Sequence, residues 1–175
     1  INQIPSVDHK INLSIVIDKS SASYDESISA GAFDRNDIKK PLQENEIYYQ
    51  LPDTREGWVL AVAQLIDLHF KNTNQNNVNK LILDMTNIRP RGAKIHGFGG
   101  TASGPTPLIE MLQDVNKVLN AKDGTNLSAV DCTDICNLIG KAVVAGNVRR
   151  SAELALGSGN NHQFITMKQD QEKLQ

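Results

Sequence analysis

An apolar stripe of helical period, enclosed by two short strand-like segments, constrains the fold of this chain more than any other feature. Segments 47–51 (IYYQL) and 81–85 (LILDM) have the composition of strands. The apolar positions between them recur at helical spacing: Trp58, Ala61, Leu65 and Leu68, widened by Val62, Ile66 and His69. Short strands that alternate with helices are typical of α/β folds, so the sequence predicts an α/β fold. The pattern leaves the direction of the strands open.

The same periodicities predict the remaining elements. The alternating segment 12–18 is expected to form a strand, and segment 153–157 (ELALG) a last short one. Helices are expected over 106–119 and from about 128 to 145. The apolar face of the former consists of Leu108, Leu112, Val115 and Leu119.

Residues that favour helix ends accompany these patterns. Asp53 is expected to cap the first helix, with Glu56 completing a capping box. Thr106 is expected to cap the second helix, with Pro107 in its first position. The pair Gly146-Asn147 is expected to end the third helix in a left-handed turn.

The totals narrow the class of protein. With 175 residues, 39% of them hydrophobic, the chain suits one domain or a large piece of one. A net charge of −2 gives no general attraction to nucleic acid or membrane surfaces. No apolar run approaches a bilayer span and no segment resembles a signal peptide, so we expect a cytoplasmic protein. The start at Ile1 and the polar end suggest an excerpt from a longer chain.

Cys132 and Cys136 are four residues apart, on one face of the expected third helix. No second Cys/His pair has the spacing to complete a tetrahedral metal shell. A disulfide within one helix is sterically unfavourable. We therefore expect free thiols and no metal site.

A glycine-rich loop, 97–105 (GFGGTASGP), precedes the second helix. It lacks the Lys-Ser/Thr that follows the last glycine of a P-loop, and Ala102 breaks the Rossmann spacing. Free backbone N–H groups and the upstream Arg89, Arg91 and Lys94 would suit a nucleotide. A plain surface connector explains the composition equally well, and both interpretations stay open.

Two further sites are ambiguous from the pattern alone. Asp53 lies where a strand leads into a helix N-terminus, which favours anions, but it could simply cap the helix. Arg149 and Arg150 could bind phosphate or carboxylate, or merely complement a helix C-terminus. The histidines form no spaced set, and no nucleophile–base pair can be nominated.

Three long blocks of the chain, 51–70, 81–112 and 134–157, resemble one family. They are similar to adenosylcobalamin-dependent, class II ribonucleotide reductases of the monomeric ribonucleoside-triphosphate type. The resemblance covers about Tyr48 to the C-terminus, and is looser upstream. It implies part of a ten-stranded α/β barrel with an effector-region insertion: a variable effector segment over 1–47 and part of the catalytic barrel over 48–175.

The resemblance also implies roles for residues. The family's D-[S/T]-x-E-G element, matched here by Asp53, Thr54, Glu56 and Gly57, belongs to the binding site of a deoxynucleoside triphosphate effector. The implied effector residues are Asp53, Thr54, Glu56 and Arg89. The implied specificity loop, mobile between effector and substrate, consists of Gly97, Gly99, Gly100, Thr101, Ala102, Ser103 and Gly104. Arg149 and Arg150 remain possible phosphate-binding or structural residues.

The family reduces ribonucleoside triphosphates at C2′ with a cysteine thiyl radical generated from adenosylcobalamin, and a thioredoxin-type dithiol supplies the electrons. Cys132 and Cys136 do not match the family's reactive cysteines. The resemblance therefore implies that this chain is part of a monomeric parent enzyme. It implies no catalytic residue and no cobalamin-binding segment within the chain itself. Two alternatives stay open: a stand-alone, non-catalytic deoxynucleotide-binding regulatory module, and a purely structural α/β domain. A reading frame that continues on both sides would favour a fragment of a longer enzyme over the stand-alone module. Absence of nucleotide binding would favour the purely structural domain.

Overall fold

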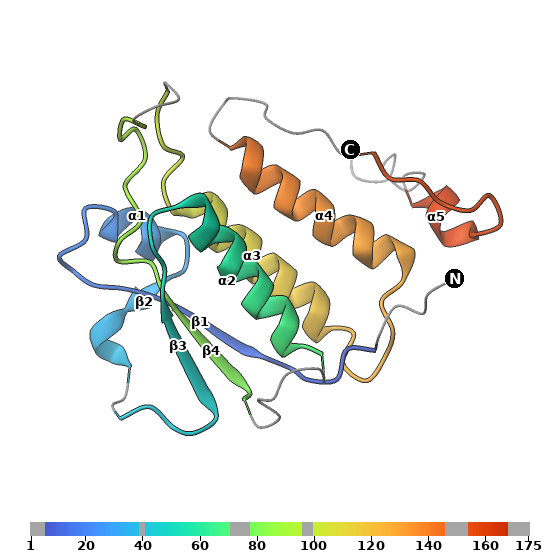
Figure 1. Cartoon of the computed structure of the whole chain (residues 1–175), viewed down its shortest axis with the longest axis horizontal. Helices are drawn as coiled ribbons and strands as arrows, with labels where there is room; N and C mark the ends of the chain where they lie inside the picture. The colour runs from blue at the N-terminus through green and yellow to red at the C-terminus, as the bar shows by residue number, and fades with distance from the viewer. Residues whose placement is uncertain (1–5, 39–40, 71–77, 96–99, 146–153, 168–175) are drawn as a thin grey trace.

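The computed structural model describes residues 6–38, 41–70, 78–95, 100–145 and 154–167. Helices and strands alternate along most of this chain (Figure 1). The strands are β1 (Asn12–Ile17), β2 (Phe33–Asp34), β3 (Glu46–Gln50) and β4 (Lys80–Asp84). The helices are α1 (Tyr24–Ser29), the 3₁₀ helix η1 (Arg35–Asp37), α2 (Arg55–Leu68), α3 (Thr106–Asn120), α4 (Ala129–Val144) and α5 (His162–Thr166).

The strands form one four-stranded sheet in the order β2-β1-β4-β3, and every pairing is parallel. The three longer strands run in step, because Val16 lies opposite Asp84, which lies opposite Gln50. Their carboxyl ends therefore meet at one edge of the sheet. The predicted α/β class is confirmed, and the parallel direction, which the sequence left open, follows from helical crossovers such as β3–α2–β4.

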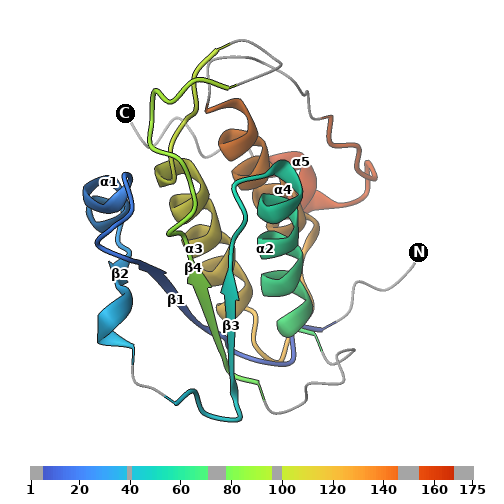
Figure 2. The same cartoon turned by 60° about the vertical axis from the view of Figure 1, so that its left-hand side comes forward.

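Helices α2 and α3 cover one face of the sheet, and α4 packs outside α3 (Figures 1 and 2). Alternate strand residues point to that face, and those in the core include Ile15, Ile17, Leu81 and Leu83. The stripe predicted for the first helix is confirmed: Ala61, Leu65 and Leu68 are buried. His69 is buried too, with Nδ1 2.8 Å from the His9 carbonyl oxygen and Nε2 3.0 Å from Asn116 Oδ1.

Two helix starts differ from prediction. Thr54, not Asp53, caps α2, because its side chain accepts from the Gly57 backbone N–H at 3.0 Å. Asp53 is instead engaged by Arg89. No capping box forms between Asp53 and Glu56.

The N-cap of α3 is Pro105, without a side-chain cap. Thr106 is therefore the first helical residue rather than the cap, and its hydroxyl donates to Glu26. The start of α4 is as predicted, since Ser128 caps it in a reciprocal box with Asp131. Gly146 and Asn147 lie outside the described residues.

The predicted strand over 153–157 is wrong for its described part, because residues 154–157 are not in a strand. Leu154 and Leu156 are 82% and 86% exposed. Alternation alone does not make a strand where no neighbouring strand supplies hydrogen bonds. The sequence analysis also missed β2 and α5, which are only two and five residues long.

Candidate functional site

The carboxyl edge of the sheet gathers acidic side chains from every strand end. These are Asp18 after β1, Asp34 at the end of β2, Asp53 after β3 and Asp84 at the end of β4. In open α/β sheets this edge is where ligands bind. The four carboxylates differ in how far partner groups enclose them.

Asp84 is fully buried and lies at the centre of what we call the Asp84 network: Asp84, Tyr48, Thr86, Arg35 and Asp18. The Tyr48 hydroxyl and the Thr86 hydroxyl and backbone N–H donate to Asp84, the last at 2.8 Å. Arg35 donates to Asp84 at 3.3 Å and to Asp18 at 2.5 Å. The network thus joins η1 to the ends of β1, β3 and β4.

The electrostatics of the network match its geometry. Burial, together with the Asp84 carboxylate, raises the pKa of Tyr48 to about 12, so the phenol stays protonated and donates. Hydrogen bonds from the Ser20 hydroxyl and backbone N–H, with the charge of Arg35, lower the pKa of Asp18. These groups satisfy one another, so the network holds the sheet edge together. Sequence analysis missed it, although an aspartate in the buried-type segment LILDM signalled a charge that needs partners.

The predicted effector residues lie beside this network and are more open. Asp53 and Arg89 form an ion pair through Oδ2 and Nε, with side chains 28% and 36% exposed. Asp53 directly precedes Thr54, so the pair adjoins the N-terminus of α2. A helix N-terminus and an arginine both favour anionic groups. Glu56 is exposed in the first turn of α2.

Local structure explains why the last residue of the D-T-x-E-G element, Gly57, is a glycine. A Cβ at this position would overlap the backbone oxygen of Pro52. Glycine therefore lets the first turn of α2 approach the strand end closely.

The glycine-rich loop lies between two segments, 91–95 and 100–106, which we call the stems of a hairpin; they hydrogen-bond to each other through residues 92–95 and 100–102, and the second stem ends where α3 begins. The Gly92 N–H donates to the Ala102 carbonyl at 2.9 Å, and the Ala102 N–H donates to the Ala93 carbonyl at 2.8 Å. Lys94 and Thr101 form an isolated bridge. Gly100 has a φ of 98°, which favours glycine.

The structure brings some of the predicted residues together. Asp53, Thr54 and Arg89 are adjacent, and the hairpin stems rise from the same end of the sheet as the start of α2 (Figure 1). Ser103 is half-buried and Gly104 buried, at the base of the second stem. The predicted residues Gly97, Gly99, Arg149 and Arg150 lie outside the described residues.

Cys132 and Cys136 are free thiols, as predicted, and burial raises the pKa of Cys132. Across the described ranges, no three His, Cys, Asp or Glu side chains gather as a metal site. None of the described helices has the length and apolar content to cross a bilayer.

Comparison with known proteins decides the family. A family model described as the insertion domain of B12-dependent ribonucleotide reductases matches residues 11–119, more than half of the chain. The chain belongs to this family. The resemblance noted in the sequence is thereby confirmed.

This chain is similar in sequence to curated adenosylcobalamin-dependent ribonucleoside-triphosphate reductases. That of Lactobacillus gasseri is 69% identical over 176 residues, and that of Lactobacillus leichmannii is 66% identical over 174. Each alignment covers 99% of this chain, but only 24% and 23% of the relative. A crystal structure of a B12-dependent, class II ribonucleotide reductase matches with a TM-score of 0.89 at 63% identity, over 99% of this chain and 23% of that one. The parallel sheet is consistent with part of the α/β barrel of such an enzyme.

The names of these relatives include adenosylcobalamin, and two hollows in the described part of this chain do not fit it. One, between α3 and α4, has a volume of about 110 Å³. The other, on the face of the sheet opposite α2 and α3, has about 460 Å³ and is lined by charged residues that include Lys80 and Glu46. Drug-sized ligands already take about 300–1,000 Å³, and a corrin is much larger.

Proposed function

We propose that this chain is the regulatory part of an adenosylcobalamin-dependent ribonucleoside-triphosphate reductase. The complete enzyme would reduce ribonucleoside triphosphates to 2′-deoxyribonucleotides, with a thioredoxin-type dithiol as reductant. This chain would bind the deoxynucleoside triphosphate effector, and we assign it no catalytic residue. The family match and the relatives support the first part of the proposal.

The Asp53–Arg89 pair carries the second part. It is half-exposed, adjoins the N-terminus of α2, and lies at the sheet edge where ligands of parallel sheets bind. A carboxylate accepts hydrogen bonds from sugar hydroxyls, and a guanidinium with a helix N-terminus attracts phosphates. Asp53 would therefore hold the deoxyribose, while Arg89, Thr54 and Glu56 would shape the surroundings of the triphosphate.

The hairpin would couple effector binding at this site to the choice of substrate. Its first stem follows Arg89 within the same chain segment, so a ligand that moves Arg89 acts directly on the stem. An effector that contacts one hairpin conformation better than another shifts the population of conformations. Each conformation would then favour one substrate base, which is allostery by differential contact.

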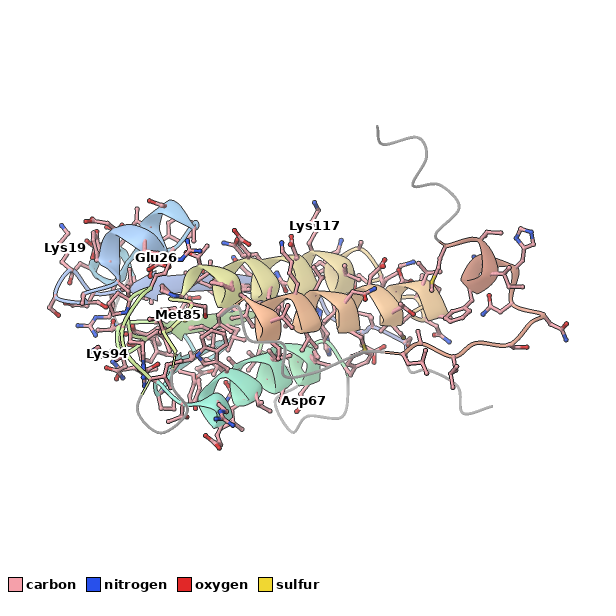
Figure 3. All side chains as sticks on the ribbon, turned by 90° about the horizontal axis from the view of Figure 1, so that it is seen from above. Lys19, Glu26, Asp67, Met85, Lys94 and Lys117 are labelled. Atoms are coloured by element: carbon pink, nitrogen blue, oxygen red, sulfur yellow. The ribbon has the colours of Figure 1, made fainter. Side chains whose placement is uncertain are left out.

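Direct binding tests this proposal. Equilibrium dialysis of the complete reductase with each deoxynucleoside triphosphate compares wild type with Asp53→Ala and with the control Asp67→Ala. Asp67 is an exposed aspartate near the other end of the same helix (Figure 3). We expect Asp53→Ala to weaken binding about 10–100-fold, as befits a lost charge-assisted hydrogen bond. Asp67→Ala should bind like wild type. Equal affinity in all three proteins would place the effector elsewhere.

A second test addresses the hairpin. Gly100→Ala forces a side chain onto a residue whose φ is 98°. We expect the complete reductase with this change to bind effector normally but to lose much of its effector-dependent choice among substrates. Unchanged choice would refute the role of hairpin conformations.

A further inference from the structure

The segment that leads into α1 makes side-chain hydrogen bonds to the chain between β4 and the first stem of the hairpin. The Ser21 hydroxyl donates to the Thr86 carbonyl at 2.9 Å, and the Ser23 hydroxyl donates to the Ile88 carbonyl at 2.8 Å. Ser23 is 1% exposed, so its hydrogen bond lies in the interior. This segment therefore fixes the chain between β4 and the hairpin.

Glu26 of α1 continues this series and reaches both stems at once. Its Oε2 accepts from the backbone N–H of Arg91, in the first stem, at 3.1 Å. Its Oε1 accepts from the hydroxyl of Thr106, at the end of the second stem, at 3.1 Å. One carboxylate thus ties together two positions fifteen residues apart in the chain (91 and 106).

Gly104 makes room for this contact. It is buried with a φ of 77°, and a Cβ there would overlap the Glu26 carboxylate. Two independent constraints, a left-handed backbone and a close approach, therefore both require glycine at this position. Figure 3 shows Glu26 at the same end of the molecule as Met85, just after β4, and Lys94 of the first stem.

We propose that Glu26 is a positioning residue that ties both stems of the hairpin, at Arg91 and Thr106, to α1, so that an effector selects among a small number of hairpin arrangements. The inference rests on the proposed function. A loop with anchored ends has a few discrete arrangements, whereas a loop with free ends has many, and a bound effector selects poorly among many. Glu26 would thus make the loop's response to the effector selective.

Hydrogen exchange in the complete reductase tests the anchoring. We expect Glu26→Ala to speed amide exchange in residues 91–95 and 100–104 about tenfold, because each stem loses one hydrogen bond to a charged acceptor, while β1 and β4 keep their rates. Glu26→Gln should behave like wild type, because its amide oxygen accepts from Arg91 and its NH₂ donates to Thr106. Asp25→Ala, at the exposed neighbouring position, is the control. Thr106→Val removes one link without touching α1 and should speed exchange in the second stem. Unchanged exchange in both Glu26→Ala and Thr106→Val would overturn the anchor.

Substrate choice tests the consequence. The ratio of kcat/KM for two ribonucleoside triphosphates is measured with each of two effectors, together with effector affinity. We expect Glu26→Ala to reduce the effector-dependent change in this ratio about fivefold, with effector affinity within about twofold of wild type, and Glu26→Gln to restore it. Faster exchange with an intact effector-dependent ratio would overturn the positioning role. If wild-type enzyme showed no effector dependence, the proposed function would fail, while the exchange rates would still decide whether Glu26 anchors the stems.

Discussion

Two aspartate–arginine pairs lie at the same edge of the sheet. Their arginines are similarly exposed, Arg35 at 31% and Arg89 at 36%, and their aspartates differ in burial. Asp84 is fully buried and is held by groups from β3, η1 and the turn after β4. Asp53 and Arg89 are 28% and 36% exposed. The residue types are the same, so the surroundings decide the role of each pair.

Burial separates the two because an unpaired charge is costly inside a protein and inexpensive at its surface. Asp84 must keep its partners, so its network cannot release them to a ligand. The Asp53–Arg89 pair can exchange its contact for a ligand's groups, because water stabilises each charge meanwhile. The closed network is therefore suited to stability and the open pair to binding.

Breaking the closed network should produce the largest effect. Asp84→Ala leaves Arg35 and the Tyr48 hydroxyl without a common acceptor, so we expect a loss of about 3–5 kcal/mol in the free energy of unfolding. Urea unfolding of the chain, followed by the fluorescence of its single tryptophan, Trp58, measures it. Asp67→Ala is the matched control and should change stability by less than about 0.5 kcal/mol. A small effect of Asp84→Ala would mean that the network does not hold the edge together.

Breaking the open pair should affect binding rather than folding. In Asp53→Ala, we expect effector affinity to fall at least about tenfold, which is about 1.4 kcal/mol, while the free energy of unfolding changes by less than about 1 kcal/mol. Dialysis and urea unfolding of the same variant give both numbers. A variant that lost stability and affinity in equal measure would remove the contrast between the two pairs.

Removing a single hydroxyl from the Asp84 network should have an intermediate effect on the free energy of unfolding. Tyr48→Phe keeps the ring and deletes one donor to Asp84. We expect a loss of about 1–2 kcal/mol in the free energy of unfolding, because a buried carboxylate loses one hydrogen bond. Urea unfolding at neutral pH measures this loss, and no loss at all would place Tyr48 outside the network.

The same hydroxyl predicts a pH dependence. The pKa of Tyr48 is about 12 in the folded chain, against about 10 in an unfolded one. Because the folded-state pKa is raised, the contribution of the Tyr48 hydroxyl to the free energy of unfolding is complete below pH 10 and is lost as the pH rises toward 12. NMR of ring-labelled tyrosine should show one resonance titrating near 12. Tyr48→Phe should remove that resonance and flatten the loss of stability between these pH values.

The sequence predicted what depends on local pattern. The stripe of Ala61, Leu65 and Leu68 and the cap at Ser128 each arise from residues close together in the chain. The Asp84 network does not, because Arg35 lies 49 residues from Asp84 in the sequence and only the register of the sheet brings the two together. For the same reason Asp53 was expected to cap α2, since its actual partner, Arg89, lies 36 residues away.

The smallest effect concerns the energy of the open pair itself. A double-mutant cycle of Asp53→Ala and Arg89→Ala should give a coupling of about 0.2–1 kcal/mol in the free energy of unfolding, typical of exposed ion pairs. In 1 M salt, where the screening length is about 3 Å, this coupling should shrink further. The matching cycle of Asp84 and Arg35 should give a larger coupling that salt changes less, because Asp84 is shielded from solvent. Equal couplings with equal salt dependence would show that burial does not separate the two pairs, and the assignment of stability to one and binding to the other would lose its physical basis.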